Sequence, residues 1–207
     1  MRKNTPIATS ANIKACLPFL KSCIKNGTPL KIELGAGEKR EGWISIDQYG
    51  DVDIVCNIVN VGIPFPDNSV DIVYSQHFFE NLSYPNPMTC VLFECKRVLK
   101  KDAIFSICVP DARIFINAYL NNDSEAFKDM KLYEPGFHYN SPLDYINYIA
   151  YMGGHHKHMF DIKNLIAILE NAGFITVRER PFDKNLDNEM RRPLSIYAEC
   201  SAPNNVQ

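Results

Sequence analysis

Two acids and two glycines between residues 31 and 47 have the spacing of a nucleotide-binding turn. Glu33 lies in a short apolar run that ends at the turn, and Gly35 and Gly37 form the turn itself. Glycine has no Cβ, so the backbone at these two positions can come close to a ligand. A second apolar run then ends at Asp47, whose carboxylate can accept hydrogen bonds from both hydroxyls of a ribose. The chemistry indicated is the binding of a nucleoside-containing ligand.

The distance between the turn and the second acid narrows the kind of nucleotide. In dinucleotide-binding folds, the ribose-binding acid follows the glycine turn by about 20 residues, because a full helix intervenes. Here only ten residues separate Gly37 from Asp47, and there is no third glycine at the expected position. The first helix must therefore be reduced to a turn or a short loop. Without its N-terminus there is no seat for a pyrophosphate, which disfavours an NAD-dependent dehydrogenase.

Histidines are the candidates for proton transfer. The chain has five, at positions 77, 138, 155, 156 and 158, and the last three follow a Gly-Gly pair. Imidazole titrates near neutral pH, so these side chains suit general acid and base chemistry. A metal site at the three clustered histidines is disfavoured, because the cluster has no i, i+4 helical pair and no nearby cysteine.

Composition limits the class of protein. A chain of 207 residues with 46% hydrophobic and 22% charged residues is expected to be one globular domain with insertions. A net charge of -2 and the lack of any lysine-rich or arginine-rich run argue against a nucleic-acid-binding surface. The seven cysteines include no C-x-x-C pair and predict reduced core thiols in a cytoplasmic protein. No apolar run approaches the ~18 residues of a membrane span, and no signal peptide is expected.

The elements that position these residues alternate between strands and helices. Strands are predicted at 30–34, 43–47, 51–56, 70–74, 103–109, 174–178 and 194–199, and helices at 9–26, 85–99, 111–120, 143–152 and 162–171. A strand, a helix and another strand in succession indicate a parallel sheet. Residues 111–160 are a candidate insertion at the carboxyl end of a sheet strand, where open α/β sheets bind ligands. Residues 181–192 are polar and show no pattern.

Five motifs in this order resemble those of class I S-adenosylmethionine-dependent methyltransferases. They are Glu33-Leu34-Gly35-Ala36-Gly37, Gly42-Trp43-Ile44-Ser45-Ile46-Asp47, Ile63-Pro64-Phe65-Pro66-Asp67-Asn68-Ser69-Val70-Asp71, Val98-Leu99-Lys100-Lys101 and Leu169-Glu170-Asn171-Ala172-Gly173-Phe174. More narrowly, they resemble the small type-11-like group whose genes often accompany sugar and surface-glycan biosynthesis. The resemblance implies a Rossmann-like, doubly wound, mostly parallel sheet with a helical insertion after the fifth strand. It implies one domain over 1–207, with an N-terminal helical segment at 1–29 and an acceptor-side insertion at 111–160.

The resemblance also assigns site residues. The backbone of the first motif would lie against the methionine part of the cofactor, and its members are Glu33, Gly35, Ala36 and Gly37. Asp47 would bind the ribose. The cofactor site would be completed by Asn57 and Ser75. Asn57 replaces an acid that relatives use at adenine, and its amide can still bond to the adenine amino group. Relatives read Ser-x-His-x-x-Glu-His after the fourth strand, whereas this chain has Asn81 in place of the second histidine.

On the acceptor side, His77 and His156 are the predicted catalytic residues, and no metal is expected. Methyl transfer from a sulfonium brings its own leaving group, so the protein supplies alignment, an apolar cavity and a place for the acceptor's proton. The predicted activity is methylation of a small polar acceptor, foremost a hydroxyl of a sugar or glycan precursor. Methylation of another metabolite on nitrogen or oxygen, a cofactor-binding protein without turnover, and an interaction module that kept the fold are the alternatives. His77 also fits a purely structural hydrogen bond, and the tyrosines of the insertion fit helix packing as well as sugar stacking.

Overall fold

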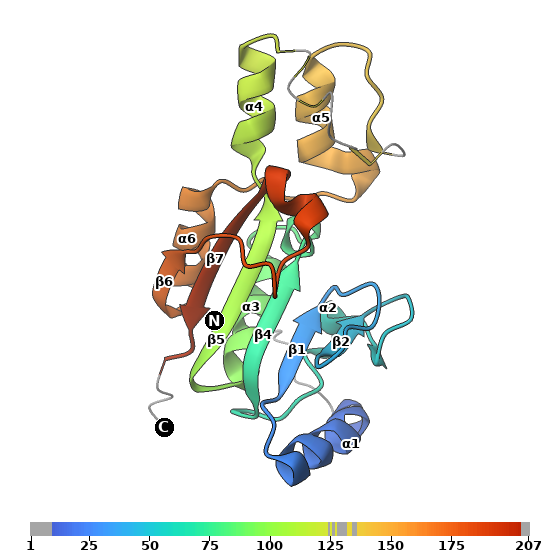
Figure 1. Ribbon diagram of the computed structural model, residues 1–207, viewed down its shortest axis with the longest axis vertical. Helices are drawn as coiled ribbons and strands as arrows, with labels where there is room; N and C mark the ends of the chain where they lie inside the picture. The colour runs from blue at the N-terminus through green and yellow to red at the C-terminus, as the bar shows by residue number, and fades with distance from the viewer. Residues whose placement is uncertain (1–9, 124, 126, 128–131, 134–135, 204–207) are drawn as a thin grey trace.

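A seven-stranded sheet forms the centre of the molecule in a computed structural model, which describes residues 10–123, 125, 127, 132–133 and 136–203 (Figure 1). The strands are β1 (Lys31–Leu34), β2 (Ile44–Asp47), β3 (Ile54–Val55), β4 (Val70–Gln76), β5 (Leu99–Pro110), β6 (Ile175–Glu179) and β7 (Ser195–Ser201). Their order is β3-β2-β1-β4-β5-β7-β6, and β7 is antiparallel to both of its neighbours. The doubly wound, mostly parallel sheet expected from the sequence is therefore confirmed.

The five predicted helices are present with small shifts of their ends, and α2 and the 3-10 turns were not predicted. The helices are α1 (Ser10–Asn26), α2 (Ile58–Val61), α3 (Met88–Val98), α4 (Ala112–Leu120), α5 (Leu143–Tyr151) and α6 (Ile162–Asn171), with short 3-10 turns η1 (Phe79–Asn81), η3 (Met152–Gly154) and η4 (Glu189–Leu194). Thr9, the predicted start of α1, lies outside the described residues. In Figure 1, α1 lies below the amino ends of the strands, whereas α4 and α5 lie above their carboxyl ends.

Local signals explain the helix ends that were predicted correctly. Asp161 caps α6 by accepting a hydrogen bond from the Asn164 N–H at 2.7 Å, and Asp111 caps α4 in the same way from Arg113. Gly173 follows α6 with φ = +83°, a conformation that glycine adopts without strain. Such caps depend on a few neighbouring residues, so a single sequence contains the whole signal.

The register of the sheet separates its side chains into two faces. Ile32 of β1 pairs with Val73 of β4, which in turn pairs with Phe105 of β5, and all three belong to the main hydrophobic core. Helices α3 and α6 contribute to the same core, and α3 is seen behind the sheet in Figure 1. Because side chains alternate along a strand, Glu33 and Tyr74 lie together on the opposite face. That second face carries most of the polar residues discussed below.

The candidate insertion after β5 has a small core of its own. Phe115 of α4 stacks on Phe127 with ring centroids 4.7 Å apart, and Tyr145 and Ile149 of α5 complete the cluster. This cluster is separate from the core beneath the sheet. The helical insertion predicted after the fifth strand is thus present, and it stands above the carboxyl edge of the sheet.

Two predicted elements differ from the structure. The strand predicted at 51–56 is reduced to the two residues of β3, because Asp53 turns its carboxylate back onto the Ser45 N–H and hydroxyl. Strand β5 begins at Leu99, directly after α3, and is longer than the predicted run 103–109. The predicted absence of a full helix between β1 and β2 is confirmed, since residues 35–43 form only turns and an isolated bridge.

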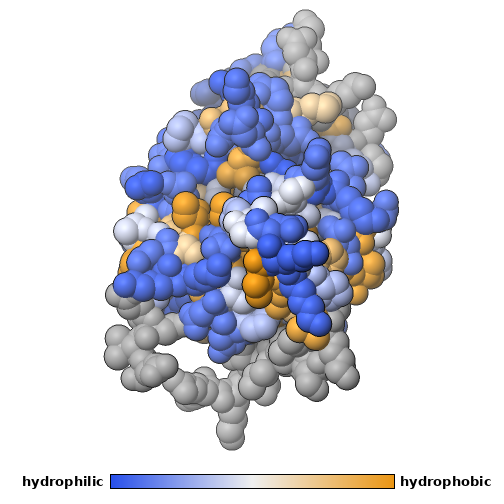
Figure 2. Space-filling view, turned by 60° about the horizontal axis from the view of Figure 1, so that its bottom comes forward, coloured by the Kyte–Doolittle hydropathy of each residue, from blue (hydrophilic) through white to orange (hydrophobic). Residues whose placement is uncertain are grey.

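Surface and cysteines are those of an ordinary globular chain. None of the seven cysteines, all within the described residues, forms a disulfide, and four of them are buried. No helix within the described residues is both long and apolar enough to cross a membrane. On the face shown in Figure 2, hydrophobic residues form small separate patches among hydrophilic ones, which needs no special explanation.

Candidate functional site

Three cavities meet at the carboxyl edge of the sheet. Their volumes are about 300, 450 and 590 Å³. Gly35 lines both the 300 and the 450 Å³ cavities, and His77 and His155 line both the 450 and the 590 Å³ cavities. Arg191 lines the 300 and the 590 Å³ cavities. The three cavities therefore adjoin one another and share wall residues.

The 300 Å³ cavity contains the first predicted motif. Glu33, Gly35 and Ala36 line it together with Arg40. The Glu33 carboxylate is 3.4 Å from Arg40 Nη1, and burial raises its pKa while that guanidinium partly opposes the shift. A largely buried carboxylate with one long ion-pair contact suits a cationic ligand group such as an ammonium.

Asp47 holds the glycine turn in place. One of its carboxylate oxygens accepts a hydrogen bond from the Gly37 N–H at 3.1 Å, and the other accepts from the Tyr49 N–H at 3.2 Å. Each oxygen keeps a further acceptor site for a ligand hydroxyl. The Gly35 N–H donates to the Ile46 carbonyl at 2.9 Å, so the turn is also bonded to β2.

Asn57 acts in the structure as a helix cap. Its side-chain oxygen accepts from the Val59 and Asn60 N–H groups, and its amide nitrogen donates to Gln48. The residue lines the 450 Å³ cavity with Asp47. Its side-chain groups are already bonded within the protein, so its contact with adenine remains a prediction.

Ser75 lies away from the cavities. It is fully buried on the core face of β4, and its hydroxyl donates to the Leu34 carbonyl at 3.3 Å. The physical reason is the alternation of side chains, since Ser75 pairs with Leu34 and points to the same face. Its neighbour Gln76 faces the other side and lines the 300 Å³ cavity.

His77 occupies a sharp turn at the end of β4. Its backbone has φ = +54°, which is uncommon for a residue other than glycine, and its N–H donates to the Cys108 carbonyl at 2.9 Å. Its Nε2 lies 2.8 Å from the Ser195 hydroxyl. Burial, the Arg191 guanidinium and His156 together lower the pKa of His77 to about 3, so the ring is neutral near pH 7.

The 590 Å³ cavity lies between the sheet edge and the insertion. Its walls are mainly aromatic and aliphatic, with a few polar side chains: Pro110, Phe115, Leu132, Tyr133, Tyr148, Ile149, Met152, Met190 and Leu194, together with His77, Glu80, His155, His156 and Arg191. A cavity of this size and character fits a small organic molecule.

His156 is a buried residue that lines this cavity. Its Nδ1 donates to the Ile149 carbonyl at 2.8 Å, because a carbonyl can only accept. Burial lowers its pKa. The neutral ring therefore keeps Nε2 as an acceptor, and the catalytic role predicted for His156 stays a prediction. Within the described residues, no group of three or more His, Cys, Asp or Glu is arranged to hold a metal ion.

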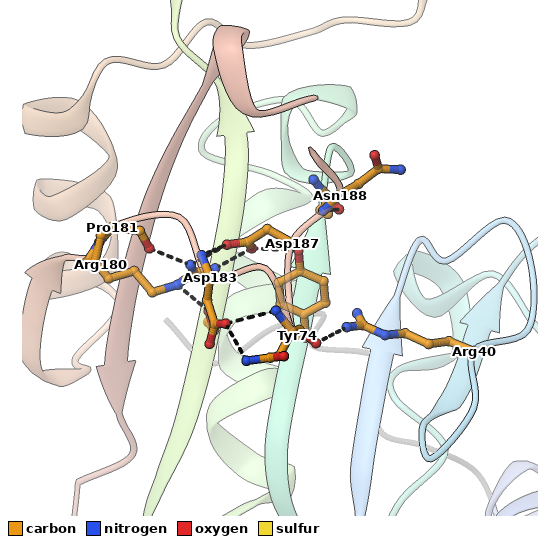
Figure 3. A network of polar contacts seen from close by, with 10 residues as sticks. Arg40, Tyr74, Arg180, Pro181, Asp183, Asp187 and Asn188 are labelled. Carbon is orange, nitrogen blue, oxygen red and sulfur yellow. Dashed lines mark hydrogen bonds and ion pairs between the residues drawn. The ribbon is translucent and has the colours of Figure 1, made fainter. Parts of the chain in front are cut away.

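Residues 180–194 close the site from the front of the sheet (Figures 1 and 3). Arg180 and Asp187 form a buried bidentate ion pair with N···O distances of 2.6 and 2.7 Å. Asp187 also accepts a hydrogen bond from the Tyr74 hydroxyl at 2.9 Å, and Arg40 donates to the Asn185 carbonyl at 3.0 Å. We call residues 180–194 the covering segment.

Sequence reasoning missed the covering segment and Glu80. The covering segment has no periodicity, and its order comes from long-range polar contacts such as Tyr74 to Asp187. Glu80 was present in the motif after β4, where relatives also carry an acid. That motif was the available signal, although it gave no indication that the carboxyl would be buried.

Comparison with known proteins agrees with this geometry. Residues 36–107 match a family model described as a methyltransferase domain. A search of curated proteins finds no significant match. Among solved structures, phosphoethanolamine N-methyltransferase 2 of Haemonchus contortus, in complex with S-adenosyl-L-methionine, superposes with a TM-score of 0.52 at 10% identity, over 95% of this chain and 58% of that one.

Two further structures have similar scores. The 1,6-didemethyltoxoflavin-N1-methyltransferase of Burkholderia thailandensis, with bound S-adenosylhomocysteine, gives a TM-score of 0.51 at 12% identity, over 94% of this chain and 80% of that one. The CMeT domain of the citrinin polyketide synthase gives 0.50 at 14% identity, over 94% and 53%. At these identities the structures support the fold alone. The family match runs from the glycine turn to β5, and two of these structures were solved with S-adenosyl-L-methionine or S-adenosylhomocysteine bound.

Proposed function

We propose that the chain transfers a methyl group from S-adenosylmethionine to a hydroxyl of a small acceptor bound in the 590 Å³ cavity. The observation that carries this proposal is the position of His77, whose side chain lines both that cavity and the 450 Å³ cavity containing Asp47. One cavity is then assigned to the acceptor and the other to the nucleoside. A group at their junction is well placed to contact the atoms that react.

The chain's own residues fit the cofactor. The Glu33 carboxylate would bind the ammonium of its methionine part, and Asp47 would accept hydrogen bonds from the ribose hydroxyls. Gly37 has no atom within 4 Å of where a Cβ would be, so its surface is open to a ligand. The cofactor supplies an electrophilic methyl group and a neutral leaving group. The protein's task is to align the acceptor and to exclude water.

The acceptor class that the sequence favours is a sugar or glycan precursor. Tyr133 and Tyr148 line the cavity, and aromatic rings can stack on the apolar face of a sugar. An amine is a second candidate, because the Glu80 carboxyl lies in the same cavity and can bind an ammonium. Methylation of another small metabolite is a further alternative, and the turnover assays described next also test it.

Calorimetry with S-adenosylmethionine and with S-adenosylhomocysteine tests the cofactor half of the proposal. We expect dissociation constants well below 1 mM, and failure of both ligands to bind at that level would reject the proposal. Turnover is then measured as S-adenosylhomocysteine release with methyl glucosides, p-cresol and phenethylamine as acceptors. Binding without turnover on any acceptor would favour a non-catalytic cofactor-binding protein.

His77→Ala and His156→Ala separate the acceptor side from the cofactor side. A loss of turnover with an unchanged cofactor dissociation constant supports an acceptor-side role. The matched control is His158→Ala, because His158 is bonded to Asn164 at 3.0 Å and is not among the residues lining the three cavities. Equal losses in all three variants would point to a general effect on folding.

A further inference from the structure

Glu80 is a buried carboxyl that faces the acceptor cavity. Its exposed fraction is 3%, and it lies in η1 directly after the turn at His77. Its backbone carbonyl accepts hydrogen bonds from the Lys157 N–H at 2.7 Å and from the His158 N–H at 3.1 Å. The residue is therefore held between the end of β4 and the loop that follows the insertion.

The side chain of Glu80 has unused hydrogen-bonding capacity. Within the described residues, its Oε2 has no hydrogen-bond partner. Its Oε1 lies 3.8 Å from His77 Nδ1, which is too far for a hydrogen bond. Buried polar groups are nearly always bonded, so an unpartnered carboxyl oxygen beside a cavity indicates a ligand contact.

The tautomer of His77 follows from its contact with the Ser195 hydroxyl. The Ser195 hydroxyl lies 2.7 Å from the Arg191 carbonyl and must donate its hydrogen there, because a carbonyl only accepts. Ser195 can then only accept from His77, so the proton of the neutral ring is on Nε2. Nδ1 consequently carries a lone pair directed toward the side of Glu80. His77 therefore directs no N–H at Glu80, and the Glu80 carboxyl receives no hydrogen bond from the ring.

We propose that Glu80 is a catalytic residue of the methyl transfer proposed above, and that its carboxylate takes the proton of the acceptor's reacting hydroxyl. The proton moves from the acceptor oxygen to the Glu80 carboxylate. The electron pair of the broken O–H bond forms the new O–CH₃ bond, and the electrons of the methyl–sulfur bond remain on sulfur. One carboxylate and one sulfonium charge disappear together, so the step balances. The inference rests on the proposed function.

The surroundings of Glu80 suit a base that works near neutral pH. Burial raises its pKa to about 8, and a hydrogen bond from its own backbone N–H and the Arg191 guanidinium partly oppose the shift. The other titratable groups around Glu80 come from several elements. Those that line the same cavity are His77 after β4, Tyr133 and Tyr148 of the insertion, His155 and His156 after η3, and Arg191 of η4. Cys108 of β5 also lies near it, and Lys157 contacts it through its backbone N–H. His77 itself, with a pKa of about 3, is too weak a base to take this proton.

The test compares Glu80→Gln with Glu94→Gln. Glutamine keeps the size of the side chain and removes its ability to take a proton. Glu94 is also 3% exposed, but its carboxylate is bonded to the Ile63 N–H and to Arg97, and it lines none of the three cavities. For each variant, calorimetry gives the S-adenosylhomocysteine dissociation constant, and turnover is followed from pH 6 to 9 with the acceptor that gives the highest rate.

We expect Glu80→Gln to bind the cofactor product within about threefold of the unaltered chain and to lose at least about 100-fold in kcat, the contribution usual for a general base. In the unaltered chain, kcat should rise about tenfold between pH 7 and pH 9, as a group of pKa about 8 loses its proton. That rise should be absent in Glu80→Gln and retained in Glu94→Gln. Turnover of Glu80→Gln within a few-fold of the unaltered chain would overturn the assignment.

A spectroscopic readout is independent of turnover. Infrared difference spectra of the chain with S-adenosylhomocysteine should show a carboxylic acid band at pH 6 that disappears as the pH rises through about 8 and that is missing in Glu80→Gln. A Glu80 already ionised at pH 6 would overturn the inference whatever the assay gives. Failure to bind either cofactor form would instead reject the proposed function, so the two failures are distinguishable.

Discussion

Breaking the buried ion pair of the covering segment should cost far more stability than breaking an exposed one. The Arg180 and Asp187 side chains are 7% and 0% exposed, and their contact is bidentate (Figure 3). Asp187→Asn keeps the shape of the side chain and removes its charge, which leaves the guanidinium buried without a counterion. Removal of one partner of such a pair typically costs about 3–5 kcal/mol. We expect a loss of this size in the free energy of unfolding.

Two further variants calibrate this number. Asp51→Asn removes one partner of the exposed pair with Lys39, where the side chains are 84% and 53% exposed, and should cost little stability because solvent screens the pair. Tyr74→Phe removes a single hydrogen bond to Asp187 and should cost about 0.5–1.5 kcal/mol. The expected order of destabilisation is therefore Asp187→Asn, then Tyr74→Phe, then Asp51→Asn.

Urea unfolding at pH 7, followed by circular dichroism and analysed with a common m value, measures all three losses. The double variant Arg180→Met with Asp187→Leu should recover much of the stability, because replacing both charges leaves neither uncompensated. An Asp187→Asn loss no larger than that of Asp51→Asn would refute the reasoning, since it would mean that the pair is solvated in solution.

Three further predictions concern the turn, the ribose acid and pH. Gly35→Ala should destabilise the chain by more than Gly37→Ala in the same urea assay: both have positive φ, but only at Gly35 would a new Cβ lie 2.6 Å from Phe78 Cβ. Asp47→Asn should weaken S-adenosylmethionine binding about 10- to 100-fold by calorimetry, because a charged acceptor is lost, and an unchanged dissociation constant would contradict the ribose contact. Between pH 6.5 and 8 the folded chain keeps a proton on Glu80 that the unfolded chain has lost. The free energy of unfolding should therefore fall by about 2 kcal/mol as the pH rises through this range. Glu80→Gln should abolish this pH dependence.

The parts of the fold with local causes could be predicted from the sequence. The caps at Asp111 and Asp161, and the turn between β1 and β2, depend on residues within a few positions of one another. The short path from Gly37 to Asp47 predicted correctly that no full helix lies there, because ten residues leave no room for one. Local patterning and chain length carry enough information for these features.

The parts of the fold and of the site that depend on strand register or on distant contacts could not be predicted from the sequence. Ser75 was predicted at the cofactor, yet the pairing of β4 with β1 turns it to the core and turns Gln76 outward. A shift of one residue exchanges the faces of a strand, and a motif alone does not define that parity. The burial of Glu80 likewise depends on a loop almost 80 positions later in the chain, through the N–H groups of Lys157 and His158.

The covering segment connects the two halves of the site. Arg191 lines both the 300 and the 590 Å³ cavities, and its carbonyl accepts the Ser195 hydrogen that determines the tautomer of His77. Loss of the Asp187 anchor should therefore affect more than stability. If the segment is held as the structure indicates, Asp187→Asn should weaken cofactor binding and raise the acceptor KM together, even at temperatures where the sheet remains folded. An effect on only one of the two would mean that the cavities are organised independently, with the covering segment serving one of them.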